Sequence, residues 1–590
     1  MPLGPTSLLT NAAEALDRRF GWDKLPRPLA LFTLIGLRNR LRERNLYDTG
    51  RGLLDRPDVS DHPRYLGART LDGTYNDLDD PLMGSLGSRF GRNVPLEFTV
   101  REPEDTLLEP NPRLISRELL TRHEFQPATT LNLLAGTWIQ FEVHDWFSHG
   151  KSEPDAPWSI PLERDDPWPA NPMEIQRTRR DPSGDAGGPP TFVTDDTHWW
   201  DGSQIYGRDA AFADGLRSGE HGKLRLDEQG LPPRDLEAHV DLTGVAGNFW
   251  VGLALLHSLF MREHNAVCDR LHEAHPDLSD DELYDKARLV IAALMAKIHT
   301  VDWTPAIIAH PTTVLALRTN WWGLEGERLD KLLGRRTKNE VIRGIPGSAT
   351  NHHGVPYSLT EEFVAVYRMH PLIPDDYSFR SLRDDTTLQE RTLPELGATH
   401  VRERLGELSM DDLLYSFGTS HPGAITLHNF PRFLQHFERP DGTLIDLASI
   451  DVLRTRERAV PRYNQFRRLL HLKPFDTFEE LADTPEHAEE LRRIYGDVER
   501  VDTMIGMYAE RKPKGFGFSD TAFRIFILMA SRRLESDRFF TRDYRPEIYT
   551  KEGIDWVESN SMRTLLLRHF PELEPALHGV ANPFAPWNRA

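Results

Sequence analysis

The chain has 590 residues, of which 39% are hydrophobic and 27% charged, and this balance is typical of a folded, water-soluble protein. Its formal net charge of −20 opposes binding to nucleic-acid phosphates, and its single cysteine excludes an internal disulfide and a thiolate metal cage. The sequence therefore predicts a protein that binds no nucleic acid and suits a reducing, cytoplasmic compartment.

The N-terminal region carries one strongly apolar stretch. Residues 29–37 (LALFTLIGL) are followed by four arginines within 38–44. Core packing is the commoner outcome for such a helix, and contact with a membrane surface is the alternative. No segment reaches the roughly 20 apolar residues of a membrane span, and we expect neither secretion nor membrane integration. We predict helices over 1–50, which would be the part nearest a membrane, and one catalytic domain over 51–590.

Apolar residues recur at intervals of three and four positions along much of the chain, which predicts a mainly α-helical fold. Proline- and glycine-rich loops separate these segments, and no internal repeat is present. A glycine-rich stretch, GSLGSRFG at 84–91, has the wrong spacing for a dinucleotide-binding loop. The segments with helical periodicity are 128–149, 248–273, 280–309, 359–370, 410–437, 461–470, 486–510 and 519–536.

The first of the long helical segments ends with a polar pair. Gln140 and His144 are four positions apart and therefore share a helix face. Such a pair among apolar neighbours either satisfies its own hydrogen bonds or is directed at a ligand. Asp145 projects about 100° away from His144, so one turn presents a neutral base on one side and an anion on the other.

A polar loop, THWWDGS, follows about fifty residues later. Its oxygen-bearing side chains alternate along the loop and would point to one side of an extended chain. Together with backbone carbonyls they would form an oxygen cage suited to a hard cation such as Ca²⁺, and an ordinary hydrogen-bonded turn is the alternative. The candidate ligands are Asp145, Thr197, Trp199, Asp201 and Ser203.

The segment 359–370 ends in a histidine. Ser358 and Glu361 have the spacing of a capping box, and the proline after His370 predicts that this histidine lies on the last turn of a helix. Tyr367 precedes it by three positions on the same face. A neutral imidazole is a good axial ligand for haem iron, so a haem bound by His370 would lie beside Tyr367.

Taken in order, the QxxxHD helix, the TxxxDxS loop and the YxxHPL helix resemble the animal-type haem peroxidase superfamily, which includes peroxidases, cyclooxygenases and fatty-acid α-dioxygenases. The stretches 257–265 and 454–467 support the resemblance. It implies a mainly α, cyclooxygenase-like fold in which haem b lies between a distal and a proximal helix.

The resemblance also implies a role for each motif residue. His144, with Gln140 beside it, would be the distal acid–base group, and His370 would be the proximal iron ligand. Asp145 would join the polar loop around calcium. Asp451 falls where peroxidases carry an asparagine next to the proximal imidazole, and a carboxylate there would make the ligand more basic.

Tyr367 favours an oxygenase over a simple peroxidase, because cyclooxygenases and α-dioxygenases resemble each other in placing a radical-forming tyrosine before the proximal histidine. Around Trp250 (GNFWV) the covalent haem ligands of peroxidases are missing, so we expect non-covalent haem b. Cyclooxygenases resemble secreted, disulfide-rich proteins, which a chain with one cysteine does not. The α-dioxygenase branch fits better, and its members are similar to this chain at 84–93, 299–304 and 531–540.

In that branch His299 and Thr304 would position the substrate, and Arg533, with Arg532 as the alternative, would pair with its carboxylate. A solvent-exposed arginine pair is the ordinary alternative. The resemblance implies that O₂ adds to the α-carbon of a long-chain fatty acid through a radical on Tyr367. A phenol peroxidase that uses H₂O₂ and a non-catalytic haem-fold protein are the other hypotheses, and the sequence does not specify chain length or oligomeric state.

Overall fold

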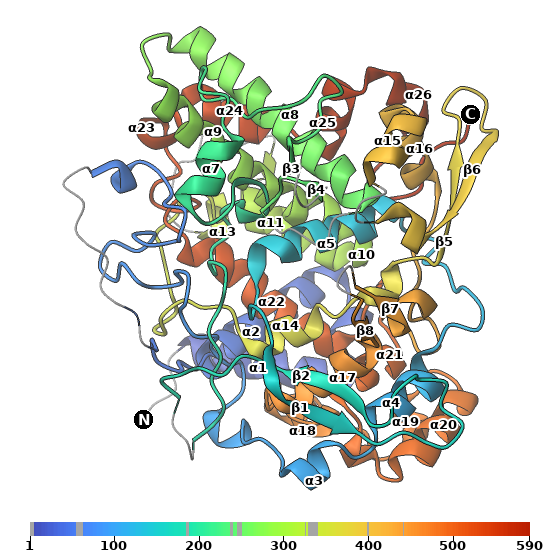
Figure 1. The fold of residues 1–590 in the computed structure, drawn as a ribbon. Coiled ribbons are helices and arrows are strands. Elements are labelled where there is room, and N and C mark those ends of the chain that lie inside the picture. The colour runs from blue at the N-terminus through green and yellow to red at the C-terminus, as the bar shows by residue number, and fades with distance from the viewer. Residues whose placement is uncertain are drawn as a thin grey trace.

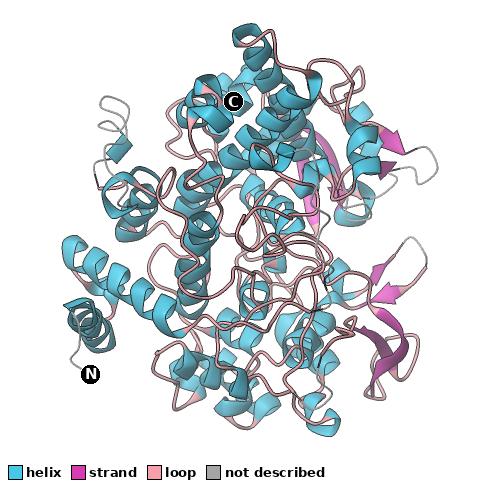
Figure 2. Ribbon diagram, turned by 90° about the vertical axis from the view of Figure 1, so that its left-hand side faces the viewer, coloured by secondary structure: helices cyan, strands magenta, loops and turns pink. Residues whose placement is uncertain are grey.

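The computed structural model describes residues 5–52, 54, 63–184, 188–235, 240–244, 250–324, 326–327, 340–397, 401–439 and 442–590. Helices dominate these residues, and small two-stranded sheets lie toward one side of the molecule (Figures 1 and 2). The mainly α-helical fold expected from the sequence is confirmed.

The α-helices are α1 (Pro5–Phe20), α2 (Arg27–Arg44), α3 (Glu104–Leu107), α4 (Pro112–Ile115), α5 (Leu133–Trp146), α6 (Ser203–Tyr206), α7 (Ala210–Leu216), α8 (Val251–Ala274), α9 (Asp280–Ile298), α10 (Thr304–Ile307), α11 (Pro311–Trp322), α13 (Glu340–Arg343), α14 (Glu361–Val366), α15 (Val401–Glu407), α16 (Met410–Thr419), α17 (Leu447–Glu457), α18 (Tyr463–Leu469), α19 (Phe478–Leu481), α20 (Pro485–Tyr495), α21 (Thr503–Ala509), α22 (Asp520–Ser536), α23 (Pro546–Tyr549), α24 (Lys551–Ser559), α25 (Met562–His569) and α26 (Glu574–Leu577). The antiparallel strand pairs are β1 (Glu153–Ile160) with β2 (Met173–Arg177), β3 (Arg234–Asp235) with β4 (Val240–Asp241), β5 (Asp376–Arg380) with β6 (Thr387–Thr392), and β7 (Phe437–Glu438) with β8 (Leu444–Ile445).

Helix α8 packs on both α5 and α9, and most residues of these three helices are buried (Figure 1). Every residue from 287 to 298 on α9 is buried, as expected for a helix that is apolar on most sides. Ser279 and Glu282 close a capping box that fixes where α9 begins. Helix α5 packs on α8, where the rings of Phe141 and Phe260 stack with centroids 5.5 Å apart. This packing gives the motif-bearing helix α5 a rigid support.

The two N-terminal helices pack on each other and on α22. Gly36 allows the close approach of α1 and α2, because a Cβ there would lie 2.3 Å from the Cβ of Ala13. On the apolar stretch, Leu34 and Leu37 are buried, whereas Leu29 remains 36% exposed. Core packing therefore accounts for one face of α2. Among the described residues, no helix is both long enough and apolar enough to span a membrane.

Two of the helices expected from periodicity are shorter in the structure. The segment 410–437 is helical only as far as Thr419, because Pro422 and Gly423 follow and the chain continues as a loop. The segment 486–510 divides into α20 and α21, because Gly496 takes a positive φ of 68° just after α20 ends. Apolar spacing alone does not show such interruptions.

Candidate active site

Helix α5 presents two different faces. One face, with side chains spaced three or four positions apart, is partly exposed and carries Gln140, Val143, His144 and, just past the helix end, Phe147. The residues that lie between these positions in the sequence are buried. Burial lowers the pKa of His144 to about 3, so its ring is neutral near pH 7, and its Nδ1 has no hydrogen-bond partner among the described residues. Gln140 Oε1 accepts a hydrogen bond of 2.8 Å from Trp250 Nε1. The partly exposed face therefore carries a neutral base.

The capping box expected at Ser358 and Glu361 is wrong. Thr360 caps α14 instead, and its hydroxyl accepts a hydrogen bond of 3.1 Å from the backbone N–H of Phe363. The Glu361 carboxylate is not free to reach back to the cap, because it contacts His149 Nε2 at 3.1 Å. A tertiary contact has thus replaced the local one.

The predicted helix also ends earlier than expected. Helix α14 stops at Val366, Tyr367 is its C-cap, and His370 begins a short 3₁₀ turn rather than ending the α-helix. His370 Nδ1 lies 2.7 Å from an oxygen of Asp451, whose other oxygen is 2.9 Å from Arg368. The second imidazole nitrogen of His370 therefore remains available to a ligand.

Asp451 lies on α17 and is completely buried beside the proximal imidazole. Burial favours its neutral form, but His370 and Arg368 outweigh that effect and keep the pKa of Asp451 below its ordinary value. The His370 side chain is itself 28% exposed. The carboxylate is thus charged at neutral pH and holds an accessible imidazole in one orientation.

Contacts at both ends of α5 hold it against the segment that carries the proximal histidine. Near the end of α5, the Trp146 ring meets the Tyr367 ring edge to face at 5.2 Å. Near its beginning, Gly136 approaches so closely that a Cβ would lie 3.3 Å from the carbonyl oxygen of Leu372. The face of α5 with His144 and the turn with His370 therefore belong to one region.

Arg533, on α22, is enclosed by aromatic rings. Its guanidinium carbon lies 4.0 Å from the ring centre of Trp146 and 4.4 Å from that of Trp200, and the residue is only 2% exposed. Its Nε and Nη2 are buried without a hydrogen-bond partner among the described residues. The His299 ring meets both indoles edge on, at 5.1 and 5.2 Å. The charge of Arg533 acts on the buried carboxyl groups of Glu142 and Asp145, but its two donors without partners can still bind an anionic ligand.

Arg532, the neighbouring residue, has a different environment. Its guanidinium donates hydrogen bonds of 2.9 Å to the carbonyl oxygens of Val355 and Pro356, and one of 3.3 Å to that of Ser358. These bonds fix the chain that leads into α14. Most of the donors of Arg532 are therefore used within the protein, whereas two of the Arg533 nitrogens are not.

His299 begins a π-helical turn (His299–Trp303), a feature often found at functional sites. Its Nδ1 is 3.2 Å from the indole Nε1 of Trp138, and an indole N–H can only donate. Burial, with a smaller effect of Arg533, holds the pKa of His299 well below its ordinary value. The ring is therefore neutral with its proton on Nε2, which can donate to a ligand. Thr304 donates 2.7 Å to the His299 carbonyl oxygen, so in this arrangement its hydroxyl fixes the turn.

The polar loop and Asp145 come together as the calcium hypothesis requires. The backbone N–H and hydroxyl of Ser203 lie 2.6 and 3.1 Å from Asp145 Oδ1, and the Thr197 hydroxyl donates to Asp201 at 3.0 Å. The second oxygen of Asp145 is buried without a partner among the described residues. The Trp199 indole donates to the backbone carbonyl oxygens of Gly73 and Met83, both at 3.0 Å, and so fixes the loop.

Negative charge accumulates around these residues. Burial and the neighbouring Asp201 raise the pKa of Asp145 to about 7. Burial likewise raises the pKa values of Asp201 and Asp196, and the nearest cation, Arg288, is 3.5 Å from Asp201. Buried carboxylates that repel one another in this way are stabilised by a bound cation.

A cavity of about 550 Å³ opens between β5, α16 and the loop around residue 123. Its lining includes Leu133 at the start of α5, together with Tyr377 and Phe417, but neither His144 nor His370. It therefore lies beside the candidate site and not between the two imidazoles.

The comparisons with known proteins agree with this geometry. The animal haem peroxidase family model matches residues 68–580. Alpha-dioxygenase PIOX of Oryza sativa subsp. japonica is 39% identical over 98% of this chain and 94% of its own length. Alpha-dioxygenase 2 of Arabidopsis thaliana is 38% identical over 98% of this chain and 93% of its own length. The crystal structure of Oryza sativa fatty acid alpha-dioxygenase has a TM-score of 0.91 at 37% identity, covering 99% of this chain and 97% of that one. The chain belongs to the animal haem peroxidase family, in its α-dioxygenase branch.

Membership of this haem peroxidase family implies that the chain binds haem, and the residues present fit that group. A neutral, partly exposed histidine stands on α5, and an accessible imidazole oriented by a carboxylate stands after α14. Of the stretch expected to lack covalent haem ligands, Gly247 to Phe249 lie outside the described residues, whereas Trp250 is described and pairs with Gln140.

In this α-dioxygenase relative, two further stretches singled out in the sequence have structural roles. The stretch 84–91 wraps around the polar loop: Gly84 has φ +65°, and a Cβ there would lie 2.8 Å from the Trp199 indole. The adjacent Arg92 forms a buried ion pair with Glu362 of α14. The stretch 454–467 contains the buried ion pair of Arg456 with Asp502, at 2.7 Å. These contacts hold the helices that carry the site.

Sequence reasoning missed the two tryptophans that enclose Arg533. Trp146 follows the distal motif directly and Trp200 lies inside the polar loop, so both were present in the motifs. Their shared contact with Arg533 joins three segments far apart in the sequence, and no local spacing could show it. Asp196, next to the loop, was also missed, although an acidic residue adjoining an oxygen cage is a usable signal.

Proposed function

We propose that this protein is a haem-dependent fatty-acid α-dioxygenase, which adds O₂ to the α-carbon of a long-chain fatty acid and yields a 2-hydroperoxy acid. One observation carries the proposal: the unpaired guanidinium of Arg533 and the phenol of Tyr367 pack against the same indole, that of Trp146. A carboxylate anchor thus lies next to a buried tyrosine. A tyrosine-to-phenylalanine variant of the rice relative has been solved with palmitic acid, which supports the substrate class.

Haem b would be held non-covalently between α5 and the turn after α14. His370 would ligate the iron through Nε2, Asp451 would hold the opposite nitrogen, and His144 would face the other side. When bound, haem supplies the peroxide-driven oxidising chemistry that converts Tyr367 to a radical. Because the His144 ring is neutral, it can accept a proton from a hydroperoxide and later return it.

The substrate carboxylate would bind Arg533 in a bidentate manner. Two guanidinium nitrogens without hydrogen-bond partners are available to donate to the two carboxylate oxygens, and the two indoles hold the guanidinium plane in place. The Nε2 proton of His299 would supply a third donor. Thr304 would act through the His299 carbonyl, and Arg532 would support the chain before α14. Anchoring the carboxylate selects the adjacent carbon for reaction.

The chemistry at that carbon needs only the phenol and O₂ once the radical exists. The Tyr367 oxygen radical removes one hydrogen atom from the α-carbon and leaves a carbon radical and the intact phenol. O₂ adds to the carbon radical to give a peroxyl radical. The peroxyl radical takes the hydrogen atom back from Tyr367, which releases the 2-hydroperoxy acid and restores the tyrosyl radical. Burial raises the pKa of Tyr367 and so keeps the phenol protonated, which lets it return the hydrogen atom to the peroxyl radical.

The acyl chain would begin along α22, where a small cavity of about 70 Å³ is lined mainly by apolar side chains. Ala530 and Phe526 line this cavity three and seven positions before Arg533, and so lie on the same helix face as the anchor. Helices α2 and α11 supply the facing wall. The apolar side chains lining the cavity are Leu31, Leu34, Ile35, Ile308, Ala316, Leu317, Ile345, Phe523, Phe526, Ile527 and Ala530.

Calcium would occupy the oxygen cage of Asp145, Thr197, Trp199, Asp201 and Ser203. The unpaired oxygen of Asp145 and the raised pKa values of the aspartates support this assignment. Because Asp145 directly follows the distal histidine, a cation there would brace the end of α5.

The N-terminal helices within residues 1–50 would touch a membrane surface, and 51–590 would form the single catalytic domain. Leu9 is 57% exposed, Phe20 49% and Leu29 36%, and the last turn of α1 carries two arginines. Because α2 also lines the apolar cavity, this surface would lie where a fatty acid enters. Co-sedimentation with anionic vesicles, expected to weaken in Phe20→Ser, tests the contact.

The decisive experiment compares O₂ consumption by the haem-loaded protein on palmitic acid with that of Tyr367→Phe. The variant is expected to lose fatty-acid-dependent uptake while it keeps its haem absorption. Tyr377→Phe is the matched control, because Tyr377 is equally buried and its hydroxyl has no hydrogen-bond partner among the described residues. Full uptake by Tyr367→Phe would refute the proposal, and rapid H₂O₂-dependent phenol oxidation without fatty-acid-dependent uptake would favour the peroxidase instead.

A further inference from the structure

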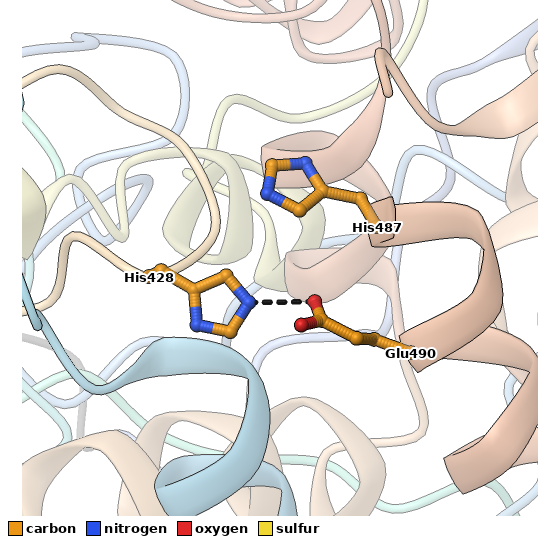
Figure 3. A group of neighbouring side chains, drawn as sticks. All are labelled: His428, His487 and Glu490. Carbon is orange, nitrogen blue, oxygen red and sulfur yellow. Dashed lines mark hydrogen bonds and ion pairs between the residues drawn. The ribbon is translucent and has the colours of Figure 1, made fainter. Parts of the chain in front are cut away.

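Two histidines and a glutamate form a cluster that the oxygenase chemistry does not use (Figure 3). His487 and Glu490 lie three positions apart on one face of α20, and His428 comes from the loop after α16. Each side chain is partly exposed, so a solute can reach the group. The cluster therefore joins two elements that are about sixty residues apart in the chain.

The ligand atoms of these residues converge on one point. His428 Nε2 lies 2.7 Å from Glu490 Oε2, and one ligand atom from each of the three residues lies within 4.8 Å of the others. The two imidazole centroids are 5.5 Å apart. Zinc with bonds of about 2.0–2.1 Å holds its ligand atoms roughly 3.3–3.5 Å apart, so a shift of about 1 Å in side-chain positions would complete the site.

A carboxylate outside the cluster orients one of its histidines. Asp483 Oδ1 accepts from His487 Nδ1 at 2.7 Å. This bond leaves His487 Nε2 as the nitrogen available to a metal, and no hydrogen bond to that atom occurs among the described residues. A carboxylate, a histidine and a metal in this order are the usual arrangement in zinc sites.

The loop that carries His428 is held rigidly. His428 takes a positive φ of 53°, which is uncommon for a residue with a side chain. Next to it, Asn429 donates to the carbonyl oxygens of Gln126 and Ala424 at 2.8 and 2.7 Å. The structure around the loop thus directs the imidazole toward α20.

We propose that His428, His487 and Glu490 bind a divalent transition-metal ion, and that zinc is the ion best suited to the site. Two imidazoles and one carboxylate match the preferences of zinc, whereas calcium and magnesium prefer oxygen ligands alone. Three protein ligands leave the fourth position to water. The ion would clip α20 to the loop, in which Phe430 packs on the proximal His370 ring at 5.6 Å.

The test uses the full-length, haem-loaded protein after treatment with a zinc-selective chelator that leaves calcium in place. Isothermal titration with zinc chloride is expected to show one zinc ion per chain. His487→Gln and Glu490→Gln should each weaken binding at least tenfold, and Asp483→Asn, which removes only the orienting carboxylate, about tenfold. His275→Gln is the matched control, because His275 pairs with Glu552 at 2.8 Å outside the cluster and should leave the affinity unchanged.

Diffraction data collected on both sides of the zinc absorption edge give an independent readout. An anomalous peak is expected about 2.0–2.1 Å from nitrogens of His428 and His487. Absence of stoichiometric binding, equal affinity in all variants, or a peak elsewhere would each overturn the proposal and leave an ion-pair cluster only. Haem absorption and melting temperature, compared across the variants, exclude misfolding as the cause of lost binding. None of these readouts depends on oxygenase activity.

Discussion

Replacement of Arg533 by methionine should separate substrate binding from stability. Methionine keeps much of the side-chain length and apolar contact with Trp146 and Trp200 but removes the charge. In the substrate-free protein the guanidinium has two buried nitrogens without hydrogen-bond partners, and its contacts with the two indoles offset that cost only in part. We therefore expect the melting temperature of Arg533→Met to equal or exceed that of the wild type.

The effect on catalysis should be large. A hydrogen bond to a charged group contributes about 1.5–3 kcal/mol, so loss of the carboxylate contact should lower kcat/KM for palmitic acid about 10- to 150-fold. Oxygen-electrode kinetics measure this change, and analysis of the products should show some oxygenation away from the α-carbon because the carboxylate is no longer fixed.

Arg532→Met is the matched control for that experiment. Its guanidinium donates to three backbone carbonyl oxygens, and each bond lost leaves an acceptor unpaired at about 1–3 kcal/mol. This variant should therefore melt at a clearly lower temperature. The reasoning would be refuted if Arg533→Met unfolded like Arg532→Met, or if it kept the kcat/KM of the wild type.

Three further predictions concern calcium, pH and the proximal ligand. Removal of calcium by a chelator should lower the melting temperature, because an ion present at 1,000 times its Kd adds about 4 kcal/mol to the free energy of unfolding. In calorimetry, Asp145→Asn should abolish this calcium dependence. Burial alone would favour the neutral acid of Glu535, but Arg42 and His353 outweigh this effect and lower its pKa from 4.5 to about 2. The ionised carboxylate therefore stabilises the folded protein fully above pH 4.5, and this stabilisation is lost as the pH falls toward 2. The free energy of unfolding should therefore fall by up to about 3 kcal/mol more in wild type than in Glu535→Gln over that range, and equal slopes would contradict the assignment. Asp451→Asn should raise the haem midpoint potential in spectroelectrochemistry, because the proximal imidazole loses its anionic partner, and an unchanged potential would argue against that role.

The sequence predicted the parts of the fold that depend on local pattern. The long helices α8, α9 and α22 lie where apolar periodicity placed them, because each buries one face over many turns. The end of α14 was misplaced by four residues, since the chain leaves the helix at Tyr367. Its start was also misassigned, because the carboxylate of Glu361 contacts His149 instead of closing a capping box. Local rules fail there because a tertiary contact competes with them.

The residues of the candidate site likewise divide into those that local motifs indicate and those that only tertiary contacts distinguish. The positions of His144, His370 and the polar loop followed from motifs whose spacing is short. The preference for Arg533 over Arg532 did not rest on local pattern, because adjacent arginines on a helix differ only in what the rest of the chain brings to each. Only the folded structure shows that one guanidinium meets carbonyl oxygens and the other meets two indoles.

The central claim is that Tyr367 carries the oxidising radical beside the anchored fatty acid. Electron paramagnetic resonance of the ferric, haem-loaded protein, frozen within seconds of adding a hydroperoxide, tests it directly. The account predicts a tyrosyl signal in the wild type and in Tyr377→Phe, and its loss in Tyr367→Phe with an unchanged haem spectrum. The same tyrosyl signal in Tyr367→Phe would place the radical on another residue and contradict the account.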